Sequence, residues 1–142
     1  MIFGIGTDLV QISRIDSLLN RWGTRFLQRV FTEKEVRYCL ARKAPSPHLA
    51  VRFAAKEAFL KALGVGYSGG IRWKDIEVVH KPSGRPAIQL HNRTKALCEH
   101  CGIEKIHLSM SHDGAYGFVQ VVLEAQKKRL RDPGPGASSS DE

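Results

Sequence analysis

The sequence contains no long apolar segment. None of its hydrophobic stretches approaches the about 18 to 20 residues that a membrane-spanning helix requires. The opening residues 1–4 also lack the positively charged flank of a secretory signal. We therefore expect a cytoplasmic protein that makes no use of a membrane.

Cysteine is scarce, with three residues in a chain of 142. An odd number of cysteines in a chain without an export signal favours reduced thiols over disulfides. Cys98 and Cys101 form a C-x-x-C pair without a second pair, so a zinc site would have to recruit histidines from elsewhere. A pair of thiols on a helix is the simpler interpretation. A chain of this length can also bury enough surface to fold without disulfides or a structural metal.

Aromatic residues make up only 8% of the chain, and most of them stand at apolar positions. A protein that binds nucleic acid on an exposed sheet would interleave aromatic side chains with lysine and arginine. The sequence lacks that signature, so we expect no nucleic-acid partner. A non-enzymatic, basic nucleic-acid-binding module is kept as an alternative because of the charge of the chain.

Acidic residues are in the minority, since 14 Asp and Glu stand against 22 Lys and Arg and the formal net charge is +8. The excess does not come from residues 127–142, in which basic and acidic side chains nearly balance. A basic folded body attracts nucleic acid, anionic lipid, phosphorylated metabolites or an acidic protein. Charge alone does not distinguish these partners.

The pattern of apolar residues indicates a single α+β domain over residues 1–126, with helices packed on an antiparallel sheet. The remaining residues, 127–142, are rich in proline, glycine and serine and predict a disordered tail. A hairpin is expected at Asp113-Gly114. The predicted strands are 1–10, 76–80, 87–90, 106–112 and 116–123.

Two capping signals predict where the first helices begin. Ser13 followed by Asp16 predicts a helix that runs toward Gly23. Thr32 followed by Glu35 predicts a second helix.

The longest predicted helix runs from Pro47 to Leu63, and a shorter one covers 92–102. The long helix is apolar on two opposite sides, which predicts that it lies between two layers. Glu57 would then point toward other parts of the protein, with Lys61 one turn away. An ordinary surface ion pair between these two residues is the alternative.

Asp8 stands inside the apolar first strand. An ionised carboxylate there is costly unless a cation or strong hydrogen bonds hold it. Capping a helix is the usual role of an isolated aspartate, but the predicted cap is Ser13, further along the chain. Two half-buried carboxylates, Asp8 and Glu57, in a basic protein suggest a magnesium site. Mg²⁺ takes one or two protein carboxylates and completes its shell with water and phosphate oxygens.

Several basic side chains could contact a phosphate. Gly64 and Gly66 would let a ligand approach the backbone, but no Gly-Lys-Ser/Thr follows and the segment is no P-loop. A metal-dependent phosphohydrolase would use the same carboxylates to activate water, and it remains an alternative. The basic candidates are Arg42, Lys43, Arg52, Lys56, Lys61, Lys81 and Arg85.

Four segments are most informative in combination. They are GIGTDLV at 4–10, FTEKE at 31–35, RFAAKEAFLKALG at 52–64 and LSMSH at 108–112. Together they closely resemble the bacterial holo-acyl-carrier-protein synthases, a family of 4′-phosphopantetheinyl transferases. The resemblance does not extend into residues 127–142.

The resemblance implies a homotrimer with a coenzyme A cleft between neighbouring subunits. It also implies transfer of 4′-phosphopantetheine from coenzyme A to a serine of apo-acyl carrier protein, releasing adenosine 3′,5′-bisphosphate and supporting fatty acid biosynthesis. Asp8 and Glu57 match the carboxylates that bind Mg²⁺ at the coenzyme A diphosphate. Lys61 matches a residue that neutralises or protonates the leaving phosphate. Either Glu57 or a metal-ordered water would take the serine proton.

The resemblance further assigns contacts with coenzyme A. Lys43, Arg52 and His112 match positions near its phosphates. Because the loop over 42–48 varies in length among such proteins, Arg42 could take the place of Lys43. The residues expected to shape the nucleotide cleft are Gly64, Gly66 and Pro86.

Arg14, Arg21 and Arg25 would form a basic helix face if the first helix continued past Gly23. Acyl carrier proteins are acidic, and the resemblance carries Arg14 to a contact with the carrier. We therefore expect these three arginines to bind the carrier protein. A solvated basic face is the alternative.

Overall fold

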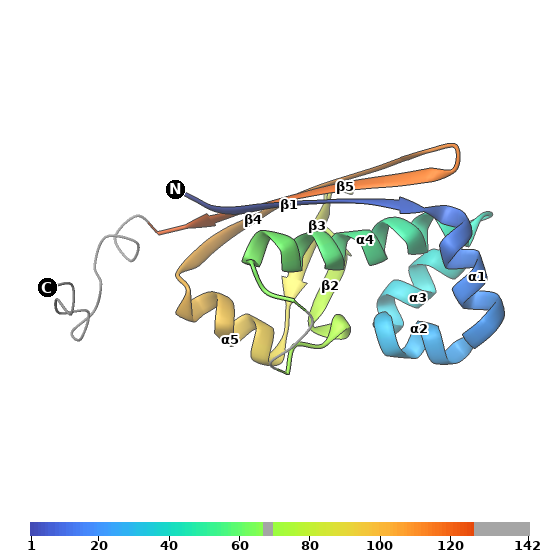
Figure 1. Cartoon of the computed structure of the whole chain (residues 1–142), viewed down its shortest axis with the longest axis horizontal. Helices are drawn as coiled ribbons and strands as arrows, with labels where there is room; N and C mark the ends of the chain where they lie inside the picture. Colours follow the sequence, from blue (N-terminus) through green and yellow to red (C-terminus); the bar gives the residue numbers. More distant parts are fainter. Residues whose placement is uncertain (67–69, 127–142) are drawn as a thin grey trace, which may run out of the picture.

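The computed structural model describes residues 1–66 and 70–126. Its larger sheet is antiparallel, with strand order β1, β5, β4 (Figure 1). The predicted tail, 127–142, and the middle of the loop after Gly64 lie outside the described residues. The strands of the sheet are β1 (Ile2–Gln11), β5 (Tyr116–Ala125) and β4 (Ile103–Asp113).

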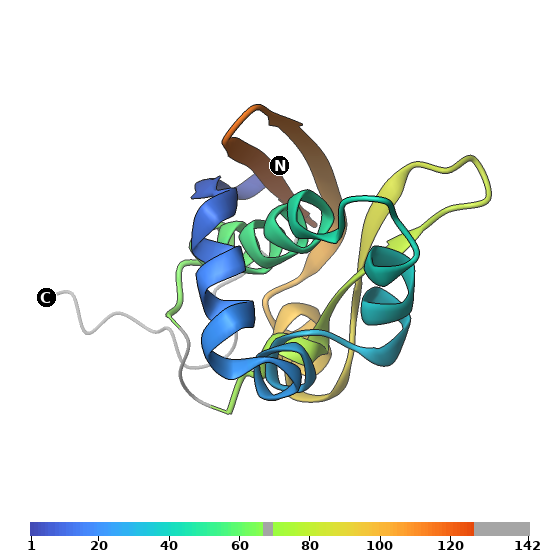
Figure 2. The same cartoon turned by 90° about the vertical axis from the view of Figure 1, so that its right-hand side faces the viewer.

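The longest helix, α4 (Pro45–Leu63), crosses one face of this sheet (Figure 1). Three helices gather at its N-terminal end, namely α1 (Ile12–Trp22), α2 (Thr24–Val30) and α3 (Glu33–Leu40). The remaining elements cover the other side of α4 (Figure 2), and they are η1 (Trp73–Asp75), β2 (Ile76–His80), β3 (Pro86–Leu90) and α5 (Asn92–His100). The prediction of an α+β fold with a helix between two layers is confirmed.

The strand β1 and the helix α4 meet backbone to backbone. A Cβ atom on Gly6 would lie 1.9 Å from the carbonyl oxygen of Ala58. A Cβ atom on Gly4 would lie 1.8 Å from the carbonyl oxygen of Ala62. Only glycine on the strand, opposite alanine on the helix, permits so close an approach. Asp8 follows on the same face of β1, because side chains alternate along a strand.

A buried ion pair joins α3 to α4. The Nζ atom of Lys56 lies 2.8 Å from Oε1 of Glu35, and both side chains are entirely buried. The ammonium also donates to the carbonyl oxygens of Trp73, at 3.1 Å, and Ile76, at 2.6 Å. The second oxygen of Glu35 accepts from the backbone N–H of Val78 at 3.0 Å. Because every proton of the ammonium has an acceptor, the pair can be buried without an unsatisfied charge.

The capping box predicted at Thr32 and Glu35 is confirmed. The backbone N–H of Thr32 donates to Oε1 of Glu35 at 2.9 Å, and the backbone N–H of Glu35 donates to Oγ1 of Thr32 at 3.2 Å. The Thr32 hydroxyl in turn donates to Glu77 at 2.6 Å. The start of α3 is thereby fixed against both α4 and β2.

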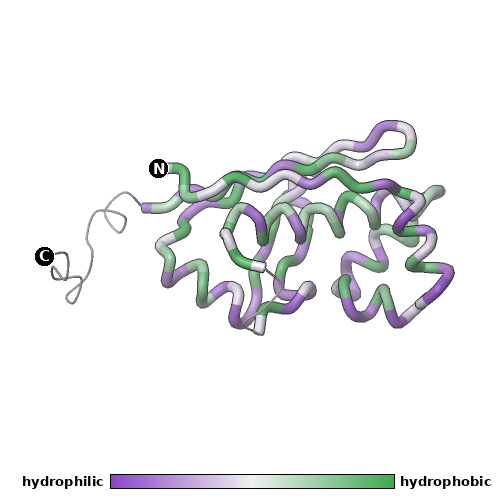
Figure 3. Tube along the Cα trace, viewed as in Figure 1, coloured by the Kyte–Doolittle hydropathy of each residue, from purple (hydrophilic) through white to green (hydrophobic). Residues whose placement is uncertain are grey.

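Among the described residues, no helix covers the face of the large sheet that points away from α4 (Figure 1). Along β5, buried and exposed residues alternate. Figure 3 shows hydrophobic positions, in green, along the strands of this sheet. Leu9 and Phe118 stand opposite each other in the register, with 64% and 46% of their surface exposed. Ile5 and Tyr116 are exposed on the same two strands. We call this surface the outer sheet face.

The cap predicted at Ser13 is wrong. The helix α1 begins at Ile12 and has no side-chain cap, because β1 runs directly into it through Gln11. Ser13 lies within the first turn, and the carboxylate of Asp16 accepts a hydrogen bond from Ser46 instead.

Two other helix boundaries differ from the prediction by about one turn or less. The helix α4 begins at Pro45 rather than at Pro47. The helix α5 ends at His100, two residues before Gly102. None of the helices in the described part of the chain combines the length and the apolar character that crossing a membrane requires.

Replacing Gly6 by alanine should destabilise the fold by about 3 kcal/mol or more, because the new Cβ would force the strand and helix apart. Urea unfolding followed by circular dichroism would measure the change. Gly66→Ala is the matched control, since a Cβ there would meet no atom within 4 Å. Equal losses of stability in the two variants would contradict this account of the contact between β1 and α4.

Candidate active site

Asp8, Glu57 and Lys61 come together where β1 passes α4. The Nζ atom of Lys61 lies 3.0 Å from Oδ1 of Asp8 and also donates to the carbonyl oxygen of Thr7 at 3.0 Å. The Asp8 side chain is only 12% exposed, whereas that of Lys61 is 56% exposed. The cation that a carboxylate inside this strand requires is therefore Lys61, and its ion pair joins α4 to β1.

Glu57 is half-buried beside this ion pair. Burial raises the pKa of Glu57 above its ordinary value, and the neighbouring carboxylate of Asp8 raises it further. Arg14 and Lys61 act in the opposite direction without cancelling the shift. The site therefore holds two carboxylates whose negative charges repel each other.

These two carboxylates fit a magnesium ion. Over residues 1–66 and 70–126, no three His, Cys, Asp or Glu side chains form a cluster able to hold a metal. Asp8 and Glu57 alone would be too few ligands for a structural zinc, but Mg²⁺ needs only one or two carboxylates. A divalent cation between them would also relieve the repulsion that raises the pKa of Glu57.

A second charged group surrounds the ring of Tyr38, and we call it the cationic cluster. The guanidinium carbons of Arg42 and Arg52 lie 4.1 Å and 4.3 Å from the ring centroid. The ring of His80 stacks on it at 4.4 Å and 28°. Arg52 is only 2% exposed and donates to the carbonyl oxygen of His48 at 3.1 Å. None of the ion pairs found in the described part of the chain involves either arginine.

The expected phosphate contacts Arg52 and His112 lie at the same end of α4. The rings of His112 and His48 are 5.8 Å apart, so that His112 borders the cationic cluster. Lys43 is exposed in the loop after α3. Between the two candidates in that loop, Arg42 is the one that contacts Tyr38.

The three residues expected to shape a nucleotide cleft are divided between the ends of α4. Gly64 ends the helix in the left-handed conformation, with φ of 83°, and Gly66 follows it in an exposed position. Pro86 lies in the hairpin, where it pairs with His80 of the cationic cluster.

Helix geometry also separates the two charged groups. Arg52 and Lys61 are nine residues apart on α4, which places their side chains about 180° apart around the helix axis. Glu57 lies about 140° from Arg52 by the same rule. Within one chain, the carboxylates and the cationic cluster therefore face different directions.

One basic candidate is excluded by the fold. Lys56 was expected among the possible phosphate contacts, but its ammonium is buried against Glu35 and two carbonyl oxygens. It is a structural residue, and the amphipathic pattern of α4 did not distinguish it from its exposed neighbour Lys61.

The three arginines expected at a carrier protein lie on two helices. Gly23, with φ of 53°, ends α1, so Arg25 belongs to α2 and a continuous basic helix face does not form. Arg14 lies 5.9 Å over the ring of Phe53 and close enough to Glu57 to act on its pKa. Arg21 lies over the ring of Trp22, the last residue of α1.

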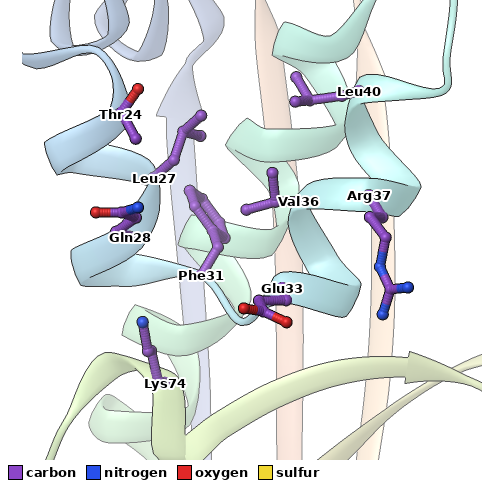
Figure 4. Close-up of a pocket in the computed structure, with 9 residues that line it drawn as sticks. All are labelled: Thr24, Leu27, Gln28, Phe31, Glu33, Val36, Arg37, Leu40 and Lys74. Atoms are coloured by element: carbon purple, nitrogen blue, oxygen red, sulfur yellow. The ribbon is translucent and has the colours of Figure 1, made fainter.

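A groove of about 610 Å³ lies between α2 and α3. Figure 4 shows Leu27, Val36 and Phe31 lining it, with Leu40 near one end. It contains neither the carboxylates nor the cationic cluster, and we assign it no part in the site.

A family model described as the 4′-phosphopantetheinyl transferase superfamily matches residues 4–118. The chain belongs to this superfamily. Holo-acyl-carrier-protein synthases of Syntrophotalea carbinolica and Geobacter sulfurreducens are 52% and 45% identical to it over 121 and 124 residues. The alignments cover 85% and 87% of this chain, and 94% and 98% of those relatives. The chain is a transferase of the holo-acyl-carrier-protein synthase type.

Solved structures of such transferases share the fold. The holo-acyl-carrier-protein synthase of Neisseria meningitidis aligns with a TM-score of 0.82 at 37% identity, over 87% of this chain and 99% of its own. The synthase of Helicobacter pylori, solved in complex with coenzyme A, aligns with a TM-score of 0.75 at 32% identity, over 84% of this chain and 99% of its own.

Sequence reasoning missed three members of the transferase's cationic cluster. Tyr38, His48 and His80 come from α3, from α4 and from the end of β2. Nothing in their spacing relates them, because only the folding of β2 against α3 and α4 brings them together. The one local sign of the cluster in the sequence is the concentration of basic residues over 37–43.

Glu57 should make the stability of the metal-free transferase depend on pH. Its folded pKa is raised, so its contribution is most favourable below the ordinary value of 4.5 and is lost as the pH rises through the folded pKa. In EDTA, Glu57→Gln should therefore lose less stability than the wild type between pH 4.5 and pH 7.5. Urea unfolding at several pH values would measure this, and parallel profiles would contradict the raised pKa.

Proposed function

We propose that the chain transfers 4′-phosphopantetheine from coenzyme A to a serine of apo-acyl carrier protein. The reaction requires Mg²⁺ and releases adenosine 3′,5′-bisphosphate, and the enzyme acts in the cytoplasm in fatty acid biosynthesis. The observation that carries this proposal is the pair of half-buried carboxylates, Asp8 and Glu57, with the ammonium of Lys61 beside them. Relatives solved with coenzyme A support the choice of donor.

Asp8 and Glu57 would hold the Mg²⁺ ion. When bound, the ion neutralises the diphosphate of coenzyme A and makes its phosphorus more electrophilic. Displacement at phosphorus depends mainly on positioning and on charge neutralisation. The cation held by the two carboxylates and the ammonium of Lys61 would supply the neutralising charge.

In this proposal, the serine oxygen forms a bond to the pantetheine-bearing phosphorus, and the bond from that phosphorus to the oxygen of the adenosine 5′-phosphate breaks. The serine proton passes either to Glu57 or to a water molecule held in the site. Lys61 neutralises the departing phosphate, or protonates it. Its ammonium is exposed, and its position is set by Asp8 and by the carbonyl oxygen of Thr7.

The coenzyme A phosphates would contact Arg52, His112 and Lys43 or Arg42, and the nucleotide would lie against Gly64, Gly66 and Pro86. Because Arg52 and Lys61 point in opposite directions from α4, one coenzyme A molecule cannot reach both within a single chain. Two copies would supply one half of the site each.

We propose a homotrimer that forms through the outer sheet face. Leu9 and Phe118 are exposed opposite each other on this face, and Ile5 and Tyr116 are exposed on the same two strands. Exposed apolar residues gathered on one surface are typical of protein interfaces.

Arg14, Arg21 and Arg25 would bind the acidic carrier protein. Arg14 connects this surface to the reacting groups, because it lies within electrostatic reach of Glu57. The net charge of +8 would steer an acidic macromolecule toward the enzyme.

Intact-mass spectrometry would test the transfer directly. Apo-acyl carrier protein incubated with the chain, coenzyme A and Mg²⁺ should gain about 340 Da, the mass of one phosphopantetheine group, and EDTA should prevent the gain.

Asp8→Ala and Glu57→Ala should lose most of the transfer activity, while the circular dichroism spectrum of each variant stays unchanged. Full activity in either variant would refute the metal assignment, and hydrolysis of coenzyme A without transfer would favour a phosphohydrolase.

Replacing Arg14 or Arg25 by alanine should raise the KM for carrier protein about tenfold, with a smaller effect on the KM for coenzyme A. The reason is the loss of a charge that meets the acidic carrier. Steady-state kinetics with each substrate varied would measure the change. Lys95→Ala on α5 removes an equal charge outside this surface and serves as the control. An unchanged carrier KM in both arginine variants would exclude this docking surface.

A further inference from the structure

The cationic cluster contains more cationic and titratable side chains than a single phosphate contact needs. Arg42, Arg52 and His80 surround Tyr38, and the ring of His48 lies edge-on at 6.2 Å from the Tyr38 ring. His112 adjoins the cluster through His48. The Nε2 atom of His80 lies 3.4 Å from the Nη2 atom of Arg52. The Nε atom of Arg52 is buried and has no hydrogen-bond partner. A buried arginine surrounded by further cationic groups is typical of a binding site for a highly charged anion.

The surroundings of the two histidines favour the neutral form of each ring. Burial lowers the pKa of His48, and Arg52, His112 and Arg42 lower it further, in that order. Burial also lowers the pKa of His80, followed by Arg52 and Arg42. Every charged group that acts on these two rings from the neighbouring elements is itself a cation or another histidine. Without an anion, protonating either histidine would add charge to an already positive cluster.

We propose that His48 and His80 bind a phosphate monoester together with Arg52, and that both histidines take up protons as it binds. The proposal rests on the proposed function, because the monoester in question is the 3′-phosphate of coenzyme A. That group carries nearly two negative charges at neutral pH, whereas each phosphorus of the coenzyme A diphosphate carries one. The histidines would make the site specific for the more highly charged group.

The direction of the pH dependence follows from charge. An anion within about 4 to 6 Å of an imidazole favours its protonated form. The phosphate therefore reverses the effect of the arginines, and a histidine that is neutral in the free enzyme becomes charged in the complex. Because binding consumes protons, affinity rises as the pH falls.

Titration calorimetry at pH 7.5 can count these protons. The full chain is titrated with coenzyme A in two buffers of different ionisation enthalpy, and the difference in apparent enthalpy gives the proton uptake. We expect an uptake of about 0.5 to 1 proton per site and affinity about threefold to tenfold higher at pH 6.5 than at pH 8. Dephospho-coenzyme A, which lacks the monoester, should bind without proton uptake.

Substitutions distinguish a phosphate ligand from a structural histidine. In His80→Gln and His48→Gln the proton uptake should fall, and in the double variant it should be lost. His80→Lys carries a permanent charge, so it should keep the affinity at pH 8 and still show less uptake than the wild type. His100→Gln on α5 lies outside the cluster and should behave as the wild type does, and thermal melting of each variant would show that it is folded.

Two results would overturn the proposal. If coenzyme A binds without proton uptake, or with an uptake that the double variant leaves unchanged, the histidines have no such role, while the proposed transferase function stands. If coenzyme A does not bind, the proposed function fails and this role fails with it.

Discussion

The contact between β1 and α4 determines the geometry of the site. Gly4 and Gly6 bring the strand against the helix backbone so closely that no side chain fits between them. Asp8 follows on the same face, and the close approach is what allows the Lys61 ammonium to reach both Asp8 and the strand backbone. A wider spacing would leave Asp8 buried without a cation. The repulsion between Asp8 and Glu57, and the magnesium site it suggests, thus depend on glycines that contact no ligand.

The buried ion pair of Lys56 and Glu35 positions the cationic cluster, as the contact between β1 and α4 positions the carboxylates. It fixes α3 and the start of β2 against the helix through bonds that satisfy all three ammonium protons. Tyr38 on α3 and His80 at the end of β2 consequently meet Arg52. Apolar residues could fill that space, but they would not fix these elements through directed hydrogen bonds.

The sequence predicted the fold class, the five strands of the described residues, the Thr32 capping box and the grouping of Asp8 with Glu57. These features have local signals, such as alternation, capping residues and a charge in an apolar strand. The cationic cluster had none, since its members come from separate elements. Lys56 shows a further limit. A basic residue on a helix that is apolar on two sides can face either a phosphate or a buried carboxylate, and only the position of Glu35 decides between them.

The same helix carries both halves of the proposed site, and this arrangement constrains how the site can be completed. An α-helix is rigid, so the angle of about 180° between Arg52 and Lys61 is not removed by small motions. A ligand long enough to span both groups must therefore pass around the helix or cross between two copies of the chain. The exposed hydrophobic outer sheet face favours the second route, because it gives neighbouring copies a surface on which to pack. In that arrangement, assembly would come before catalysis, since neither half of the site alone would hold coenzyme A at both its phosphates and its reacting phosphorus.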